Sequence, residues 1–256
     1  MENEAKNPIK SVHTSFRLLE ALSRSSGMGV SELAREIDVT KGTVHNHLST
    51  LRERGYVVQR ANEYHLGSRL IGFGTAIRDR SPLYRHSRDI LTSLAQSTGE
   101  AACIAVEEEG YVVYQRIVPE ETDAERLLSE GCRLPLHCSA PGKCLLADRT
   151  NDEIREYLSN YTGLKLPERT TSDPDELVEE IRTVREQNLG FARGEYTDEL
   201  YEVATPVSAG GERTRGAVGV FGPKERMSGK ALQQDTAGLV LNAAKRVEVA
   251  IHRASV

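Results

Sequence analysis

The sequence predicts an α+β fold, in which a small N-terminal module of three helices and a hairpin precedes a larger domain of mixed helices and strands. Helical spacing of apolar residues dominates the first part of the chain, and from residue 82 onward helical and strand patterns alternate. Residues 1–80 hold 12 Lys and Arg against 9 Asp and Glu, whereas the remaining 176 hold 21 against 29. A net of +3 followed by a net of −8 indicates a cationic module attached to an acidic one, although chance scatter of surface charge would give the same counts.

Three helices and a hairpin are predicted in the first module. The first helix covers 12–24, with an inward stripe at Val12, Phe16, Leu19 and Leu22. Ser31 is expected to cap the second helix, which turns Leu33, Ala34 and Ile37 inward. In the third helix Thr40 is the expected N-cap, and one face carries Val44, Leu48 and Leu51. After Gly55, two short β-like runs around Ala-Asn-Glu predict the hairpin.

Helix, helix, tight turn, helix and hairpin is the order of a winged helix-turn-helix, whose third helix enters the major groove of DNA. On that helix His45 and His47 point about 200° apart, so they cannot bind one metal ion. Lys41 and the backbone N–H groups that begin at Thr40 lie at a positive helix end, where a phosphate binds well, and Gly42 lets the backbone approach closely. His47 is expected at the edge of the core.

The polar face of the third helix supplies the remaining candidate contacts to DNA. Four side chains could reach base edges, and Asn is a good bidentate match for adenine; they are Thr43, His45, Asn46 and Ser49. Arg52 is better placed for a phosphate, and Arg60 lies near the wing. The alternative interpretation is a helical bundle with a solvated polar face.

The run VSELAREIDVTKGTVHNHLSTLRERGYV, followed by YHLGSRLIGFG, resembles the DNA-binding half of the IclR family of transcriptional regulators. The resemblance continues through LPLHCSAPGKCLLA and through GFARGE, VATPV and GAVGVFGP, so it covers nearly the whole chain. It implies a winged helix-turn-helix over 1–67, a linker helix over 68–81 that supports dimerisation, and a GAF-like effector-binding domain over 82–256. Ser81-Pro82 interrupts the helical pattern at the expected boundary.

The larger domain reads as a largely antiparallel sheet with flanking helices. Helices are expected over 83–99, from Pro141, over 151–159, over 174–188 and over 229–254. Strands are expected in two runs within 101–118, in segments of 125–131 and 133–140, and over 190–196, 201–209 and 216–222.

The candidate effector site combines a helix start with residues placed by the resemblance. Ser139 can cap the helix that begins near Pro141, which would present free N–H groups to an acceptor atom. The resemblance places Ser139, Ala140 and Gly142 in the effector loop and Glu195 at an acidic effector contact. It also places Glu202, Gly219 and Phe221 where relatives that bind small keto acids have Cys and serines. Ordinary sheet packing is the alternative interpretation of each.

Two carboxylates at such a site disfavour an anionic ligand. Glu195 and Glu202 would repel a small organic acid, whereas the hydroxyl groups of a sugar-type ligand would donate hydrogen bonds to them. We therefore expect a sugar-type effector ahead of a small organic acid.

Catalysis is not expected. The Gly-Lys-Cys at 142–144 is no phosphate loop, because His137 stands where the first glycine is required and Cys144 replaces the Ser or Thr. His137 and Cys138 would point to opposite faces of a strand, so they could not act together. No catalytic residue, cofactor or metal site is predicted. A ligand-binding enzyme with an accessory winged helix is a weaker alternative.

The cysteines leave one other function open. Cys132, Cys138 and Cys144 fall six residues apart with His137 among them, whereas zinc ligands favour spacings of about two to four. Cysteines packed as small hydrophobic residues are favoured, and the alternative is a DNA-binding redox or metal switch. No apolar run approaches the ~20 residues of a membrane span. MENEAKNPIKS has no apolar region and the chain has no C-x-x-C pair, so a cytoplasmic protein is expected. We expect a regulator that acts as a dimer or dimer of dimers. Because a dimer presents two equal helices, its operator should be a near-palindrome.

Overall fold

The computed structural model describes residues 7–118, 127–161, 165–208, 216–227, 229 and 235–254. The chain divides into two compact units, one within Asn3–Arg80 and the other within Ser81–Val256. No helix among the described residues is long and apolar enough to cross a membrane. Each unit has its own hydrophobic core, so each is described separately below.

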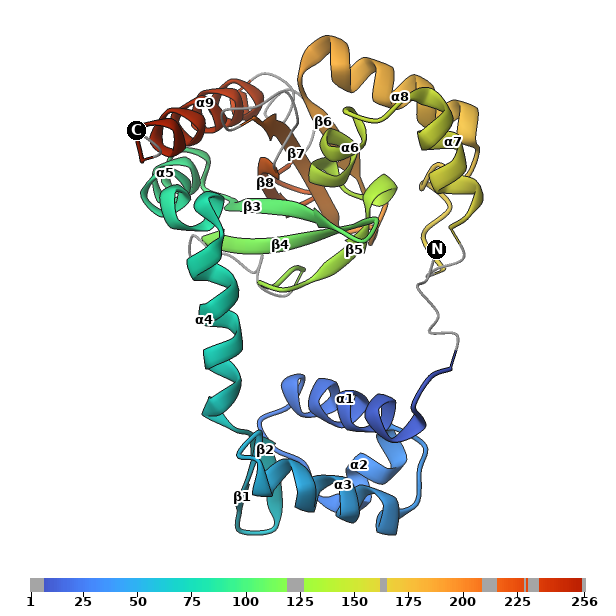
Figure 1. Cartoon of the computed structure of the whole chain (residues 1–256). Coiled ribbons are helices and arrows are strands. Elements are labelled where there is room, and N and C mark those ends of the chain that lie inside the picture. The colour runs from blue at the N-terminus through green and yellow to red at the C-terminus, as the bar shows by residue number, and fades with distance from the viewer. Residues whose placement is uncertain are drawn as a thin grey trace. The chain divides into compact units, whose positions relative to one another are not determined.

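The smaller unit has the predicted order of elements (Figure 1). Its three helices are α1 (Lys10–Ser23), α2 (Val30–Glu36) and α3 (Lys41–Glu53). The strands β1 (Val57–Arg60) and β2 (Glu63–Leu66) pair antiparallel as a hairpin. A short 3₁₀ helix η1 (Ser68–Leu70) then leads into α4 (Ile71–Arg80). This is a winged helix-turn-helix followed by one further helix.

The core of the smaller unit confirms the predicted inward faces of α2 and α3 but only part of that of α1. The residues confirmed as buried are Leu33, Ala34, Ile37, Val44 and Leu48, and Leu51 is half-buried against the same core. In α1 the prediction was wrong for two residues, because Val12 is 48% exposed and Phe16 is 61% exposed. Leu22 is buried and Leu19 is partly buried against the core, as predicted, and Leu18 and Ala21 complete the face of α1 that meets the core.

The expected cap of α2 was also wrong. The helix begins at Val30, and its N-cap is Gly29 rather than Ser31. The carboxylate of Glu32 accepts the Gly29 N–H at 3.1 Å, which is the half of a capping box that the third residue of the helix supplies.

The larger unit is built on one six-stranded sheet with the order β5-β4-β3-β8-β7-β6, and all neighbours are antiparallel. The strands are β3 (Ala101–Glu108), β4 (Tyr111–Val118), β5 (Arg133–Pro135), β6 (Gly190–Arg193), β7 (Leu200–Val207) and β8 (Gly216–Pro223). The helices are α5 (Pro82–Thr98), α6 (Ala140–Leu146), α7 (Asn151–Ser159), α8 (Pro174–Gln187) and α9 (Ala237–Ala254). The α+β fold class is thereby confirmed.

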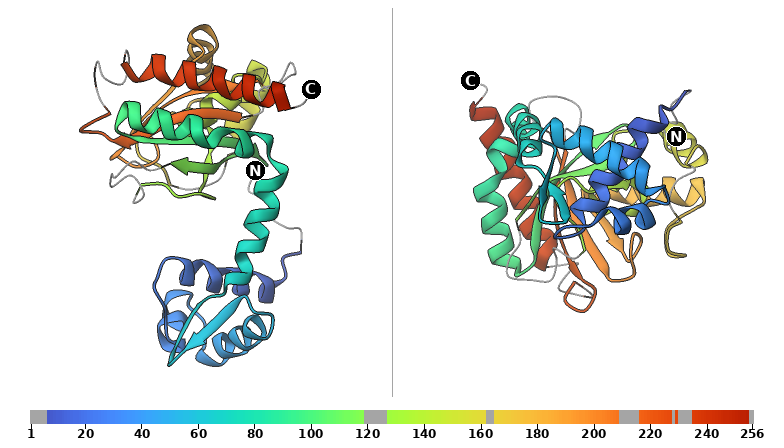
Figure 2. Two further views of the ribbon diagram at one scale, coloured as in Figure 1. Left: turned by 90° about the vertical axis from the view of Figure 1, so that its left-hand side faces the viewer. Right: turned by 90° about the horizontal axis from the view of Figure 1, so that it is seen from below.

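The sheet separates two hydrophobic cores. Helices α5 and α9 lie side by side over one face (Figure 2), where they pack on Val203, Val218 and Val220. Helix α6 covers the other face, where Cys103 and Phe221 are buried. Consecutive strand residues therefore belong to different cores, as the period of two requires.

Two predicted strand segments differ from the structure. Residues 127–131 form a turn, in which the N–H of Gly131 donates to the carbonyl of Tyr114 at 2.8 Å; residues 125 and 126 lie outside the described part of the chain. Of the segment 133–140 only β5 is a strand. The chain then forms the 3₁₀ helix η3 (Leu136–Cys138), because the Tyr157 hydroxyl accepts the N–H of Leu136 at 2.9 Å and takes it away from strand pairing. The predicted long closing helix overlaps α9, and parts of 228–234 lie outside the described residues.

Candidate functional site

The N-terminal end of α3 is fixed by its cap. The Thr40 hydroxyl oxygen accepts the N–H of Thr43 at 3.2 Å and lies 2.9 Å from the Thr43 hydroxyl. Thr43 is consequently half-buried and engaged in the cap, while Lys41 and Gly42 stay exposed beside it. The predicted cap is confirmed, and it leaves the first turn of α3 with a lysine and free space for an anion.

The polar face of α3 points away from the core. Val44 and Leu48 hold the opposite face fully buried, and the candidate DNA contacts on α3 that are exposed are Lys41, Gly42, His45, Asn46, Ser49 and Arg52. Among them His45, Asn46 and Ser49 carry side-chain donors and acceptors of the kind that read base edges, and Lys41 and Arg52 carry positive charge.

The wing is tied to the end of α3. Arg52 donates from Nη1 to the Gln59 side chain at 2.5 Å, and Gln59 in turn donates to the carbonyl of Ala61 at 3.3 Å. Arg60 is exposed at the end of β1, and neither it nor Lys41 forms an ion pair with any residue in the described part of the chain. Both cations are therefore available to phosphates.

His47 of α3 is half-buried against α1, in agreement with the expectation that it lies at the edge of the core. Its Nδ1 is 2.8 Å from the Ser15 hydroxyl. Both residues line a pocket of about 290 Å³, together with Ser11, Val12, Asn46 and Thr50. No group of three potential metal ligands occurs among the residues that the structure describes.

Every backbone N–H in the first turn of α6 already has an acceptor, so the expectation of free N–H groups at this helix start was wrong. Ser139 caps the helix as predicted, and its hydroxyl accepts the N–H of Gly142 at 3.2 Å. Pro141 has no N–H, and the N–H of Lys143 donates to the Ser139 carbonyl at 3.0 Å. The remaining N–H, that of Ala140, donates to Glu202 Oε2 at 3.0 Å. A carboxylate 62 residues away thus occupies the position foreseen for a ligand.

Glu202 is almost completely enclosed, at 1% exposure. Its second oxygen, Oε1, accepts a hydrogen bond from the Tyr114 hydroxyl at 2.6 Å. Burial raises the pKa of Glu202 to about 7, although the hydrogen bonds from Tyr114 and Ala140 act in the opposite direction. The charge of this carboxyl therefore changes near neutral pH.

Phe221 and Gly219 form the wall beside Glu202. Phe221 lies opposite Glu202 in the β7–β8 register, and its ring meets that of Tyr114 edge-on at 6.3 Å. At Gly219 a Cβ atom would lie 3.0 Å from the carbonyl oxygen of Val203, so the backbone packs closely there.

Gly142 is required by close packing. A Cβ at this position would lie 2.2 Å from the carbonyl oxygen of Leu136, a distance that no side chain tolerates. The residues from Ser139 to Gly142 are therefore locked against η3, and the structure brings together Ser139, Ala140, Gly142, Glu202, Gly219 and Phe221 around one end of α6.

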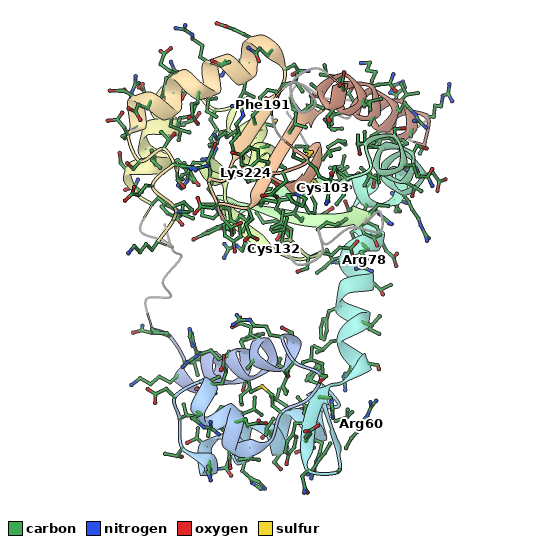
Figure 3. The ribbon with its side chains drawn as sticks, turned by 180° about the vertical axis from the view of Figure 1, so that it is seen from behind. Arg60, Arg78, Cys103, Cys132, Phe191 and Lys224 are labelled. Atoms are coloured by element: carbon green, nitrogen blue, oxygen red, sulfur yellow. The ribbon has the colours of Figure 1, made fainter. Side chains whose placement is uncertain are left out.

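Sequence reasoning missed Lys143, a buried cation on α6 that is 3% exposed. Its Nζ lies 2.6 Å from Glu195 Oε2 and 3.0 Å from Glu180 Oε2, and it donates to the carbonyl of Phe191 on β6, labelled in Figure 3. Burial acts to lower the pKa of Lys143, but the charges of Glu195 and Glu180 outweigh it and the pKa is raised. Glu195, a candidate effector contact, is thus already paired; a lysine within the apolar run around α6 was the signal for this.

The cysteines are packed as small hydrophobic residues. All four are free thiols: Cys103, Cys138 and Cys144 are buried, and Cys132 is half-buried (Figure 3). Burial raises the pKa of Cys144 to about 12 and raises that of Cys138 as well, so both thiols stay protonated and unreactive.

His137 and Cys138 do not form a catalytic pair, although the reason given by the sequence was wrong. They lie on a 3₁₀ helix and not on a strand. His137 Nδ1 is 3.1 Å from the Tyr157 hydroxyl, and the Cys138 thiol donates to the carbonyl of Pro135. Burial lowers the pKa of His137 to about 4, so the ring is neutral at physiological pH.

Two family models match the chain. One, described as the IclR helix-turn-helix domain, matches residues 11–61, and the other, described as the bacterial transcriptional regulator IclR C-terminal domain, matches residues 75–249. Among curated relatives, the probable HTH-type transcriptional regulator ArcR of Halobacterium salinarum is 29% identical and the alignment covers 99% of this chain and 100% of the relative. KdgR of Escherichia coli is also 29% identical, over 78% of this chain and 76% of that protein.

Solved structures share the fold over nearly the full length. A crystal structure from Rhodococcus sp. RHA1 has a TM-score of 0.79 at 25% identity, and it covers 96% of this chain and 100% of that one. The IclR protein of Thermotoga maritima has a TM-score of 0.77 at 20% identity, with 95% and 99% covered. The relatives are transcriptional regulators and not enzymes, which agrees with the expectation for this sequence. Because the two family models span most of the sequence, the chain belongs to the IclR family of DNA-binding transcriptional regulators.

Proposed function

We propose that this protein acts in the cytoplasm as an effector-responsive regulator that reads a near-palindromic operator as a dimer or dimer of dimers. The observation that supports operator reading is the capped helix α3, which exposes His45, Asn46 and Ser49; nearby, Lys41 and Arg60 form no ion pair with any described residue. We propose the division into 1–67, 68–81 and 82–256 for DNA binding, linker and effector binding; in the structure α4 belongs to the smaller unit.

Roles on the DNA follow from position and charge. Asn46, exposed in the middle of α3, suits a bidentate contact to one base, with His45 and Ser49 beside it. Lys41 at the helix start and Arg60 on the wing suit phosphates, which any sequence supplies. Thr40, Gly42, Thr43 and Arg52 act mainly by positioning the helix and the wing.

Self-association is supported by apolar side chains that the chain itself does not cover. On α1, Ile9, Val12 and Phe16 share one helical face and are exposed. On α4, Phe73 and Ile77 lie on one face and are also exposed. Apolar stripes of this kind mark interaction surfaces, and a second copy would offer the same stripes in return. Replacement of Ile77 with Asp should shift the protein toward monomer in sedimentation experiments.

The effector site proposed here lies between the sheet and α6. The half-buried side chains of Cys132 and Tyr196 pack against this core and give a ligand its first contacts. One IclR homologue from Microbacterium hydrocarbonoxydans was solved in complex with 4-hydroxybenzoate, and the Streptomyces coelicolor relative is named the glycerol operon regulatory protein. Since Glu195, Glu202 and Glu180 outnumber Lys143, we propose a neutral, hydroxyl-rich effector ahead of a small organic acid.

Two substitutions test the DNA assignment. Asn46→Ala should relax base preference at one position per half-site, at a cost of roughly 1–3 kcal/mol there. Lys41→Ala should weaken binding to all sequences about equally and flatten the salt dependence. Both variants are compared with the unaltered protein on a randomised site library; identical profiles for the two would contradict the assignment. A footprint on a single asymmetric half-site would contradict the dimeric reading.

A further inference from the structure

Glu202 already occupies the backbone N–H at the start of α6 that a ligand anion would need at the proposed effector site. Both carboxylate oxygens are engaged, one by the Ala140 N–H at 3.0 Å and the other by the Tyr114 hydroxyl at 2.6 Å. The remaining N–H groups in the first turn of α6 are satisfied by Ser139. A ligand carboxylate would therefore meet backbone N–H groups that already have acceptors, and it would lie beside a buried carboxylate.

We infer that Glu202 is a specificity-determining residue, which excludes carboxylate ligands from this site and admits neutral ligands of similar shape. The inference rests on the proposed effector site and names the property by which that site selects its ligand. Two like charges in a poorly solvated interior repel strongly, and an added anion would have to displace Glu202 from its partners or lie beside it unpaired.

The charged groups around Glu202 do not offset this repulsion. Lys143 is already shared between Glu195 and Glu180, so its charge is committed. The other titratable groups near Glu202 are Tyr114 on β4, Cys103 on β3, Cys138 on η3, Cys144 on α6 and the half-buried Cys132. Burial raises the pKa of each of these groups, so they stay neutral at physiological pH, and the charge that a ligand would meet comes from Glu202 and from the nearby pair of Lys143 and Glu195.

The exclusion of carboxylate ligands by Glu202 should weaken as the pH falls. Burial raises the pKa of Glu202 to about 7, so the carboxyl is mostly ionised near pH 8 and mostly neutral near pH 6. A ligand carboxylate should then bind better at the lower pH, while a neutral ligand should not respond to this group. His137 stays neutral over the same range because burial lowers its pKa to about 4.

Matched acid and amide pairs test the inference on the full chain. Lactate with lactamide, gluconate with gluconamide, and 4-hydroxybenzoate with 4-hydroxybenzamide differ in charge but hardly in shape. Affinities are measured by calorimetry and thermal shift for the unaltered protein, for Glu202→Gln and for the control Glu199→Gln. Glu199 is exposed three residues away, so the control removes the same charge from the surface of the same strand region.

The unaltered protein should bind an amide more tightly than the matched acid near pH 8. Glu202→Gln should raise the acid-to-amide affinity ratio about tenfold or more, and Glu199→Gln should leave it within about twofold. An unchanged ratio in Glu202→Gln, or an acid bound by the unaltered protein as tightly as its amide, would overturn the inference while leaving the effector site in place. Binding of no pair to any of the proteins would instead reject the effector site itself.

The pH series keeps the test independent of the variant. If Glu202→Gln does not fold, the unaltered protein should still show an acid-to-amide ratio that rises as pH falls from about 8 to about 6. A ratio that stays flat over this interval would also overturn the inference.

Discussion

Replacement of Lys143 with Met would remove a buried cation and leave the carboxylate that it neutralises. Nζ lies 2.6 Å from Glu195 Oε2, an oxygen with no other hydrogen-bond partner among the described residues. Glu180 is 40% exposed at its side chain, so water can replace its contact. Removal of one partner of a buried pair costs about 3–5 kcal/mol, and Met keeps most of the apolar stem. At about 2–4 °C per kcal/mol for a domain of this size, the larger unit should unfold roughly 10 °C lower.

The loss should depend on pH through Glu195. Burial already raises the pKa of Glu195 while Lys143 opposes it, and removal of the cation raises it further. A carboxyl with a higher pKa in the folded state destabilises the fold above the unfolded pKa, where the unfolded chain releases its proton more readily. The deficit should therefore be largest near pH 8 and shrink toward pH 5.

Calorimetric unfolding of the full chain at both pH values measures this loss. Lys245→Met is the control, because Lys245 also lies 3.0 Å from a glutamate, Glu248, but is 77% exposed; its loss should stay within about 1 kcal/mol. The double variant Lys143→Met/Glu195→Gln should recover much of the stability at pH 8. A loss below about 1 kcal/mol for Lys143→Met, or one equal at both pH values, would refute the reasoning from buried charge.

Three further outcomes are expected. Gly142→Ala should lower the unfolding temperature of the larger unit, because its Cβ would meet the Leu136 carbonyl oxygen at 2.2 Å; an unchanged temperature would contradict the close packing. Thr40→Ala should destabilise α3 by about 1 kcal/mol in thermal unfolding, whereas Thr40→Ser should retain the cap to Thr43. Maleimide labelling of the native protein should modify Cys132 first, and Cys132→Ser should remain largely unlabelled; rapid labelling of the three buried thiols would show that their core opens.

The local sequence pattern predicted most helices and strands correctly. It failed where the burial of a side chain depends on which other part of the protein packs against it. Thr40, Val44 and Leu48 specify the start and inner face of α3 within nine residues of sequence, and the structure agrees. The apolar spacing of Val12 and Phe16 also predicts a buried helix face, but spacing alone does not identify the surface that would bury it. In the structure of the single chain, Val12 and Phe16 are exposed, because α1 packs on the core through Leu18, Ala21 and Leu22.

The candidate ligand site could be predicted only in part because its decisive contacts are long-range. Ser139 as a helix cap follows from adjacent residues. The bond from Ala140 to Glu202 joins residues 62 apart, and no local pattern indicates that a carboxylate returns to the start of α6. Lys143 was open to prediction, since a lysine inside an apolar helix must have anionic partners when buried, but its partners Glu180 and Glu195 come from a different helix and a loop.

Alternate residues along one strand of the sheet belong either to the side that carries the proposed effector site or to the second hydrophobic core. On β7, Glu202 bonds to α6 while its neighbour Val203 belongs to the core under α5 and α9; on β8, Phe221 and Val220 divide in the same way. If the proposed effector site is correct, substitutions at alternate positions change the residues that face the ligand, while the intervening residues preserve the second core. Such a sheet allows ligand preference to diverge in evolution by point mutation without a new backbone, and it gives a protein engineer the same route.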